Sequence, residues 1–309
     1  MNNIAPVLIS VLDRENHFKN CVTSLAKNPL AKKTHLFIAL DAPFTEKQRI
    51  GYSKVLSFVE KISGFKKVTI FRREKNMGSS PNQFLAMEDI FKQYDRLIFT
   101  EDDNIFSPNF LDFVNQGLEL FKDKKDVFSV TGYNYLVVMP KSYTNNYYIF
   151  PGFEAWGVGL WKEKWNKVDF SVAGCRKDNP LTISNIFKIN AIAGCAVPAL
   201  FNLAQFGVLP DDFAVGLHMI KNNMYGVFPI ISKVRNNGLD GSGENGGISG
   251  FYYNQHIDEA ETIHIEIDKG IKPNPDILRV LKKFKKLKYK QKIKLFFQYL
   301  QFKLFKINI

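Results

Sequence analysis

Cysteine and long apolar runs are scarce in this sequence. Its 309 residues include only Cys21, Cys175 and Cys195, which are too few and too scattered for a disulfide framework or a zinc site and favour a reducing compartment. No apolar run approaches the ~18 residues that a membrane span needs. The short apolar stretch 5–12 lacks a basic flank before it and runs straight into Asp13, unlike a signal peptide. We therefore expect a cytoplasmic protein.

Acidic residues are missing from the C-terminal segment 277–309, which has one arginine, ten lysines and no Asp or Glu. The rest of the chain is nearly neutral and offers no broad basic surface for a polyanion. Within the segment, apolar residues recur at helical spacing between lysines, as at Ile293, Phe296, Phe297 and Leu300. This pattern predicts a basic amphipathic tail that holds the protein peripherally on the anionic inner face of the cell membrane.

Two alternatives for the segment remain open. It can be a terminal helix docked on the body, or an arm that binds nucleic acid. The second is weaker, because lysine dominates and arginine, which suits bidentate base contacts, appears once.

The first half of the chain has the spacing of alternating strands and helices. Short continuous apolar runs occupy 7–12, 36–40, 68–72 and 97–100, which predicts parallel strands covered by helices on both faces. Ser-Pro pairs at 80–81 and 107–108 are typical of helix starts. The sequence thus predicts an α/β fold with a mostly parallel, Rossmann-like sheet.

The second half is aromatic-rich and less regular. It has two predicted strands, at 127–131 and around 226–231, and its glycine-rich stretch 236–250 predicts a mobile loop. We divide the chain into two halves and a tail, with bounds 1–125, 126–271 and 277–309.

Three consecutive carboxylates form the strongest functional signal. Glu101, Asp102 and Asp103 directly follow an apolar strand and precede a predicted helix. Ligands of open α/β sheets bind at the carboxyl ends of strands, and adjacent carboxylates repel one another unless a cation compensates. The triplet therefore indicates a divalent-metal site, with a solvated or helix-capping acidic loop as the alternative.

The triplet and its surroundings resemble a known family. The stretch 98–103, followed by Ser-Pro-Asn-Phe at 107–110, is similar to the D-x-D-type motif of GT-A-fold glycosyltransferases, in particular the N-acetylglucosaminyltransferase I-like group and its bacterial family 2-like relatives. The resemblance spans roughly residues 5–255 and extends to further segments, at 6–14, 39–41, 150–153 and 231–234.

The resemblance implies a nucleotide-sugar site. Asp103 would bind Mn²⁺ (or Mg²⁺) that bridges the diphosphate of a UDP-sugar, while Glu101 and Asp102 would face the ribose, the phosphates or metal-bound water. Arg14 and Asp41 match nucleotide-binding positions. A surface ion pair for Arg14 and a turn for Asp41 are the alternatives.

Other residues have weaker assignments. Asn76 and Gly78 precede a helix N-terminus, where backbone amides bind phosphate or sugar or simply form a turn. An inverting transfer needs a general base, and the resemblance favours Asp212 over its neighbour Asp211, one of which is expected to cap a helix.

Three tryptophans gather near Glu154. Aromatic faces suit sugars, so we assign Glu154 and Trp156 to the acceptor and expect Trp161 and Trp165 to pack in the core. The family's loop histidine is absent near 240–244, which leaves His256 or His264, downstream, as possible substitutes.

Together these features predict a metal-dependent inverting glycosyltransferase that moves a hexosyl or N-acetylhexosaminyl group from a UDP-sugar to a glycan or lipid-linked saccharide in surface polysaccharide synthesis. A sugar-phosphate nucleotidyltransferase is the alternative enzyme, although the stretch 12–16 lacks the glycine-rich loop that it needs. A non-catalytic membrane-bound adaptor that keeps the fold is the other alternative.

Overall fold

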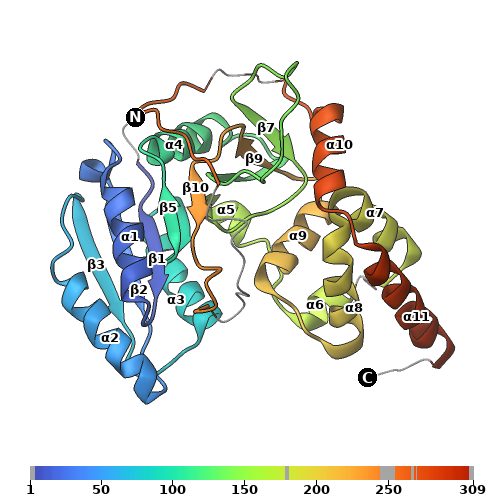
Figure 1. Ribbon diagram of the computed structural model, residues 1–309, viewed down its shortest axis with the longest axis horizontal. Coiled ribbons are helices and arrows are strands. Elements are labelled where there is room, and N and C mark those ends of the chain that lie inside the picture. The colour runs from blue at the N-terminus through green and yellow to red at the C-terminus, as the bar shows by residue number, and fades with distance from the viewer. Residues whose placement is uncertain (1–3, 178–180, 244–254, 266–267, 269, 306–309) are drawn as a thin grey trace.

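The computed structural model (Figure 1) describes residues 4–177, 181–243, 255–265, 268 and 270–305. An eight-stranded sheet crosses both halves of the chain, in the order β3-β2-β1-β4-β8-β6-β9-β7. A second sheet pairs β5 with β10. The strands are β1 (Val7–Val11), β2 (His35–Leu40), β3 (Lys67–Arg72), β4 (Arg96–Glu101), β5 (Asn104–Phe106), β6 (Val127–Thr131), β7 (Tyr147–Phe150), β8 (Val158–Trp161), β9 (Tyr225–Pro229) and β10 (Val234–Asn236).

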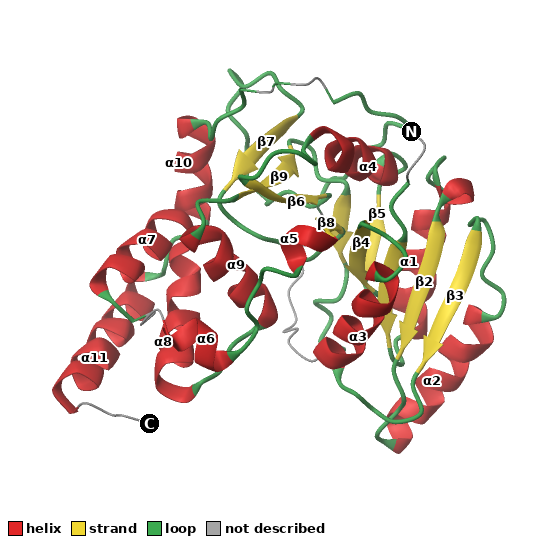
Figure 2. Cartoon of the chain, turned by 180° about the vertical axis from the view of Figure 1, so that it is seen from behind, coloured by secondary structure: helices red, strands yellow, loops and turns green. Residues whose placement is uncertain are grey.

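Helices cover both faces of the large sheet (Figures 1 and 2). The main helices are α1 (Glu15–Ala26), α2 (Glu46–Val59), α3 (Ser79–Phe91), α4 (Phe110–Leu120), α5 (Lys162–Trp165), α6 (Val172–Lys177), α7 (Ile183–Ala193), α8 (Val197–Phe206), α9 (Asp211–Lys221), α10 (Pro275–Phe284) and α11 (Tyr289–Phe305). Two short 3₁₀ helices are η1 (Ala31–Lys33) and η2 (Gly194–Ala196).

Side chains along β1 point alternately to the two faces of the large sheet, and each face has its own core. Val7 and Ile9 pack into a core with α1, α2 and α4, whereas Leu8 packs on the other face with α3 and α9. Both faces are apolar, so the strand has no polar alternation. The predicted α/β class, with a mostly parallel sheet flanked by helices and a C-terminal helix, is confirmed.

Strands β1 to β4 are mutually parallel, so their carboxyl ends meet at one edge of the sheet. In the second half, β8 runs antiparallel to β4 and β6, and β7 runs antiparallel to β9. The predicted strand at 127–131 is β6, and the one around 226–231 is β9. The helix starts predicted from Ser-Pro pairs are displaced slightly, because Gly78 and Asn109 are the observed N-caps.

Residues 183–206, for which the sequence predicts no element, form α7, η2 and α8. By length and composition this is the one helical stretch among the described residues that could cross a membrane. A third of its most apolar part is buried in the protein. This finding corrects the expectation that no apolar run approaches the length of a membrane span, since the stretch is long and apolar enough although Lys188 interrupts it. Its inward residues, including Leu200 and Phe201, pack in a third core with α11.

The basic segment begins within the folded body. Ile277 and Leu281 on α10 are 1% and 0% exposed in the main core, and Leu287 and Leu295 pack in the third core beside α7 and α8. Up to Leu295 the segment therefore matches the docked-helix alternative. The outer face of α11 stays exposed.

Of the predicted loop 236–250, residues 244–250 lie outside the described residues.

Because α10 supplies core side chains, shortening one of these side chains should lower the stability of the fold. Leu281→Ala should lower the free energy of unfolding by about 2–5 kcal/mol, since it removes a fully buried side chain. Leu300→Ala, the matched control on exposed α11, should change it by less than about 0.5 kcal/mol. Urea unfolding measures both values, and a loss in Leu281→Ala as small as that expected of the control would show that α10 does not belong to the core.

Candidate functional site

An arginine and two carboxylates join the carboxyl ends of β1 and β4. Arg14, the N-cap residue of α1, pairs with Asp102 through Nε and Nη2 and donates from Nη2 to Asp103 Oδ2 at 2.9 Å. Both aspartates are buried, at 4% and 7% exposure. Buried carboxylates are costly without a cation, so the guanidinium is what allows two of them to lie side by side.

The short sheet clamps Asp103 from the other side. Asn236, the last residue of β10, donates from Nδ2 to Asp103 Oδ1 at 2.8 Å, and the backbone N–H of Asn237 donates to the Asp103 carbonyl at 2.9 Å. A Cβ on Gly238 would lie 2.0 Å from Asp103 Oδ2, so the backbone approaches the carboxylate where only glycine fits. The start of the glycine-rich loop is thus part of this site.

The crowding of acids shifts their proton affinity. Burial, together with the carboxylates of Asp103 and Asp102, raises the pKa of Glu101 to about 8. Burial likewise raises the pKa of Asp102 to about 6, against the opposing charge of Arg14. Asp212 adds to the rise at Glu101, so acids from β4 and α9 are close enough to interact.

Asp41 follows β2 on the neighbouring strand end. Its carboxylate accepts hydrogen bonds from three backbone N–H groups, those of Ala42 and Met77 at 2.9 Å and of Gly78 at 3.0 Å. Asn76 donates to the Ala42 carbonyl at 2.7 Å. The positive φ of Gly78 (81°) favours glycine there. Asp41 therefore fixes the turn before α3, and it brings Asn76 and Gly78 to the strand end.

A cavity of about 680 Å³ opens beside Arg14. It is lined by the start of α1, by α2 and by the loop after β10. His17 Nε2 lies 2.9 Å from Asp240 Oδ2 and 3.4 Å from Ser242 Oγ, so α1 holds the loop over the cavity. Lys47 and Lys54 also line it. This cavity is large enough for part of a nucleotide-sized ligand.

A second group of acids lies at the start of α9 and on the connection between β7 and β8. Asp211 and Asp212 occupy the first turn of α9, where Pro210 is the N-cap residue. The prediction that one of the two aspartates is the N-cap is therefore wrong. Burial and the nearby carboxylate of Glu154 raise the pKa of Asp212. Glu154 in turn accepts a hydrogen bond from Lys285 Nζ at 3.1 Å. The charge of Asp212 in turn raises the pKa of Glu101, so Asp212 interacts electrostatically with acids of both groups.

Trp161 and Trp165 pack in the cores as expected, and Trp156 packs against the main core as well. Trp161 is 6% exposed and packs in the main core, and Trp165 packs against Phe84 and Phe170. Trp156 is partly exposed and meets the ring of Tyr133 edge-on at 4.8 Å. It lies two residues from Glu154, on the same connection between β7 and β8.

Three residues of the site were missed in the sequence. His17 lies one helical turn after Arg14, and that i, i+3 spacing was an available signal. Asn236 and Lys285 reach their partners across 133 and 131 residues of sequence, for which no local pattern exists. His256 and His264, considered as substitutes for a loop histidine, are both exposed, whereas His17 contacts the described part of the loop at Asp240 and Ser242.

The site offers oxygen donors to a cation. Among the described residues no ready-made group of three or more His, Cys, Asp or Glu ligands is present. A magnesium-like ion needs only one or two carboxylates when phosphate and water supply its other ligands. The carboxylates of Asp102 and Asp103 fit that requirement, provided that Arg14 shares them with the ion.

The sequence matches no protein-family model, and it matches no curated protein. Similar solved structures include S. aureus TarS in complex with UDP-GlcNAc (17% identity, TM-score 0.31, covering 41% of this chain and 33% of that one). A mannosyltransferase from Pyrobaculum calidifontis in complex with GDP-Man and Mn²⁺ has 10% identity and a TM-score of 0.40, covering 71% and 69%. GalNAc-T7 with UDP, GalNAc and Mn²⁺ has 12% identity and a TM-score of 0.45, covering 75% and 44%.

The match therefore spans only about a third of the TarS chain. All three identities lie below 25% and all three TM-scores below 0.5. The function proposed below rests on the geometry of the site and not on these similarities.

The acid cluster predicts a pH-dependent stability in the absence of metal. A carboxyl whose pKa is raised by folding stabilises the protein below its unfolded pKa and loses that contribution as the pH rises through the folded value. With Glu101 at about 8 and Asp102 at about 6, the free energy of unfolding in EDTA should fall by more than about 1 kcal/mol from pH 5 to pH 8.5.

Glu101→Gln should remove much of this fall, because glutamine cannot ionise. Glu119→Gln is the control. Hydrogen bonding to Lys122 lowers the pKa of Glu119, so it titrates below this range and its loss should leave the slope unchanged. Urea unfolding at several pH values measures the slope, and a stability that rises with pH would contradict the account.

Proposed function

We propose that this protein is a GT-A-type glycosyltransferase that transfers a sugar from a nucleotide diphosphate donor. The observation that supports this most is the Arg14–Asp102–Asp103 group, whose two aspartates are buried and which lies at the carboxyl ends of parallel strands beside the 680 Å³ cavity. That edge of an open α/β sheet is where ligands bind. A cationic and an anionic group side by side suit a ligand that carries both phosphates and a metal ion.

In the donor complex, we assign the nucleoside to the cavity beside Arg14. Asp41 would act by holding the turn of Asn76 and Gly78 through its hydrogen bonds from the N–H groups of Met77 and Gly78, so that the turn and the N-terminus of α3 would lie beside the donor. Asp102 and Glu101 would face ribose, phosphate or water. Lys47 and Lys54, which line the cavity, add positive charge for the phosphates. We propose a UDP-sugar as the donor.

Asp103, with Asp102 beside it, would hold the divalent ion, Mn²⁺ or Mg²⁺. The ion would supply charge neutralisation for the departing nucleotide diphosphate. Arg14 would then move part of its hydrogen bonding from Asp103 to the phosphates, which guanidinium groups bind well. Asn236 keeps the Asp103 carboxylate oriented from the opposite side.

Asp212 would be the general base of an inverting transfer. Its side chain reaches solvent although the surrounding protein partly desolvates its carboxylate, and the raised pKa makes that carboxylate a stronger base. Glu154 and Trp156 on the β7–β8 connection would bind the acceptor hydroxyls and sugar face. We propose a glycan or lipid-linked saccharide as the acceptor, in surface polysaccharide synthesis.

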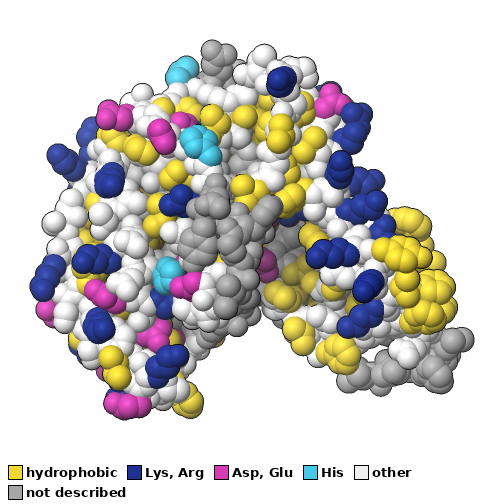
Figure 3. Space-filling model, viewed as in Figure 1, with side chains coloured by type: hydrophobic (Ala, Val, Ile, Leu, Met, Phe, Trp, Pro, Cys, Tyr) yellow, Lys and Arg dark blue, Asp and Glu magenta, His cyan; other side chains and the backbone are white. Residues whose placement is uncertain are grey.

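We also propose that α11 lies on an anionic membrane. Its exposed apolar side chains are Ile293, Phe296, Phe297 and Leu300, at 42%, 59%, 59% and 37% exposure. At 3.6 residues per turn these four form one stripe opposite the buried Leu295. Exposed lysines flank the stripe on both sides, at 290, 292 and 294. Figure 3 shows the apolar side chains gathered at the place of α11, with Lys and Arg side chains beside them.

A binding screen tests the donor assignment. Calorimetry should show that one UDP-sugar among UDP-, GDP- and CDP-linked sugars binds in Mn²⁺ and at least about 10-fold more weakly in EDTA. Asp103→Ala should abolish the difference between Mn²⁺ and EDTA, since it removes the metal ligand, while Asp89→Ala on the exposed face of α3 should preserve it. Metal-dependent affinity that survives in Asp103→Ala would place the ion elsewhere.

Substituting the two neighbouring aspartates tests the base. Asp212→Asn should lower kcat by roughly 10²-fold or more, in line with general-base contributions, and leave donor affinity close to wild type. Asp211→Asn is the matched control and should change kcat by less than about 3-fold, since it is not the assigned base. The reverse pattern would make Asp211 the base, and no loss in either variant would rule out this mechanism.

Vesicle sedimentation tests the membrane proposal. Deleting 277–309 would remove core residues of α10, so the better variant is Phe296→Ser with Phe297→Ser. It should weaken binding to phosphatidylglycerol vesicles by at least about 10-fold through lost apolar burial. Phe44→Ser with Val138→Ser is the control, because these residues are 80% and 87% exposed elsewhere. Equal binding by both double variants would contradict the proposal.

A further inference from the structure

A buried ion pair joins two segments of the chain on either side of the glycine-rich stretch. Lys233, the residue before β10, is 1% exposed and pairs with Asp258 through its ammonium group. Removing two charges from water is costly, and apolar residues in their place are often at least as stable. The pair therefore needs an explanation other than the stability of the fold.

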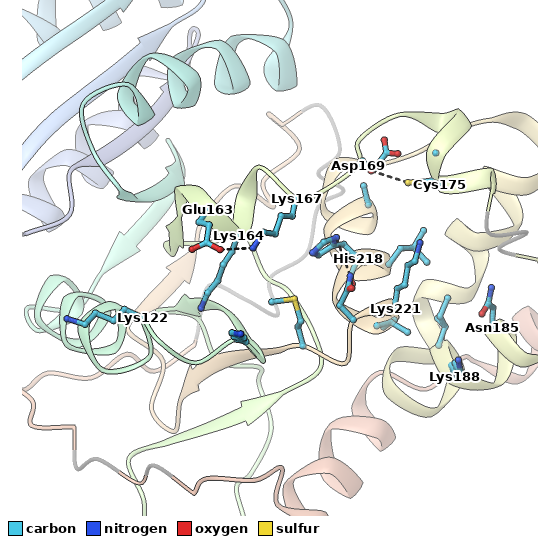
Figure 4. Close-up of a pocket in the computed structure, with 18 of the residues that line it drawn as sticks. Lys122, Glu163, Lys164, Lys167, Asp169, Cys175, Asn185, Lys188, His218 and Lys221 are labelled. Carbon is cyan, nitrogen blue, oxygen red and sulfur yellow. Dashed lines mark hydrogen bonds and ion pairs between the residues drawn. The ribbon is translucent and has the colours of Figure 1, made fainter.

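Several other lysines pair with acids about one helical turn away. At the largest cavity, of about 1190 Å³, Lys167 pairs with Glu163 at 2.6 Å (Figure 4). Lys122, which also lines this cavity, pairs with Glu119 three residues before it. All four side chains are exposed, so these local pairs contribute little to stability. The pair at Lys233 differs from them, because it is buried and holds separate segments together.

Asp258 is firmly held at its place. Its Oδ2 accepts a hydrogen bond from Asn109 Nδ2 at 2.9 Å, and its Oδ1 accepts one from the backbone N–H of Ala260 at 3.0 Å. Its own N–H donates to the carbonyl of Ser232 at 2.9 Å. Since Asn109 is the N-cap residue of α4, Asp258 connects the start of that helix to the residue before Lys233.

The backbone of Lys233 is fixed at the same point. Its N–H donates to the carbonyl of Gly132 at 2.7 Å, and its carbonyl accepts from the N–H of Ser107 at 2.9 Å. Gly132 follows β6, and Ser107 follows β5. The ion pair and these two hydrogen bonds hold Lys233 to three separate segments, and so they set where β10 begins.

The three-residue strand β10 depends on such an anchor. It forms a two-stranded sheet with β5, in which Asn236 lies opposite Asn104, and two-stranded pairs are marginal by themselves. A slip of one residue would turn every side chain of the strand to the opposite face. Asn236 would then lose its hydrogen bond to Asp103 Oδ1, and Gly238 would no longer lie against that carboxylate.

We propose that Lys233 is a positioning residue for the carboxylate of Asp103. Its ion pair with Asp258 fixes the register of β10, and the register brings Asn236 to Asp103. Because Lys233 lies about 10 Å along the strand from Asn236, it acts through the strand and does not touch the metal ligand. The inference rests on the proposed function in taking Asp103 as the metal ligand, whereas the placement of Asn236 by Lys233 does not depend on it.

Mn²⁺ titration in the presence of UDP, followed by electron paramagnetic resonance, tests the proposal. Lys233→Met with Asp258→Asn removes both charges, so no buried charge is left unpaired. This variant should bind Mn²⁺ at least about 10-fold more weakly than wild type, the loss typical when a group that orients a metal ligand is removed. If it does not fold, Lys233→Gln with Asp258→Asn, which keeps two polar partners, should show a loss in the same direction.

The matched control is Arg96→Met with Glu119→Gln. It also neutralises a buried cation and an acid partner, but at the start of β4, away from Asp103. The affinity for Mn²⁺ should change by less than about 3-fold, since distant sites are usually independent. Equal losses in this variant and in the Lys233 variant would overturn the proposal.

A double-mutant cycle distinguishes positioning from a merely structural role. Asn236→Ala should weaken Mn²⁺ binding by at least about 10-fold, because Asp103 loses the donor that orients it. Adding Lys233→Met and Asp258→Asn to Asn236→Ala should then weaken it by less than about 3-fold further. Losses that multiply would show that Lys233 does not act through Asn236, contrary to the proposal.

The side-chain amide of Asn236 gives a readout that needs neither metal nor nucleotide. In protein labelled with ¹⁵N-asparagine, its resonance, assigned by its absence in Asn236→Ala, should shift in Lys233→Met with Asp258→Asn and stay in place in the Arg96 control. An unshifted resonance in the Lys233 variant would refute the positioning role. Wild-type protein that binds no Mn²⁺ would instead contradict the proposed function, and the amide resonance would still decide the role of Lys233.

Discussion

The ion pairing of Arg14 with two buried aspartates is the constraint on which the candidate site depends. Three carboxyls follow one another at the end of β4, and Asp102 and Asp103 are nearly inaccessible to water. Like charges in such a place need a compensating cation or a proton. In the metal-free protein Arg14 supplies the cation, and the raised pKa of Glu101 supplies the proton. A bound metal ion would take over both roles.

A similar pairing connects the C-terminal helices to the other side of the site. Lys285, which follows α10, pairs with Glu154 at 3.1 Å, and Glu154 influences Asp212. The buried side chains of α10 fix the position of Lys285. The basic segment is therefore a structural part of the proposed acceptor region, and its exposed outer face remains available for a membrane.

Local sequence patterns predicted the features that depend on residues near one another in the chain, namely the strands and the acidic triplet. The strands at 7–12, 36–40, 68–72 and 97–100 were predictable because both faces are buried and the runs are short. The acidic triplet was recognisable because it follows a strand directly. The pairing of Arg14 with Asp102, by contrast, joins residues 88 apart, and a carboxylate alone does not reveal which cation it will meet.

Long-range packing determined the features that local patterns do not predict. Charge composition made 277–309 look separate from the body, yet two apolar positions, Ile277 and Leu281, were enough to place α10 in the core. The stretch 183–206 went unassigned because its apolar residues surround the helix rather than forming one stripe. Asp41 matched a nucleotide-binding position by resemblance, and its three backbone hydrogen bonds became visible only in the folded chain.

The electron paramagnetic resonance signal of free Mn²⁺ tests the central claim most directly. In the presence of both the protein and UDP, the signal at a fixed Mn²⁺ concentration should fall well below the levels seen with protein alone and with UDP alone. That loss would indicate a ternary complex, since the carboxylates and the diphosphate would share one ion. If the loss of signal with both components only equals the sum of the losses with protein alone and with UDP alone, a metal-bridged donor site at Asp103 would be contradicted.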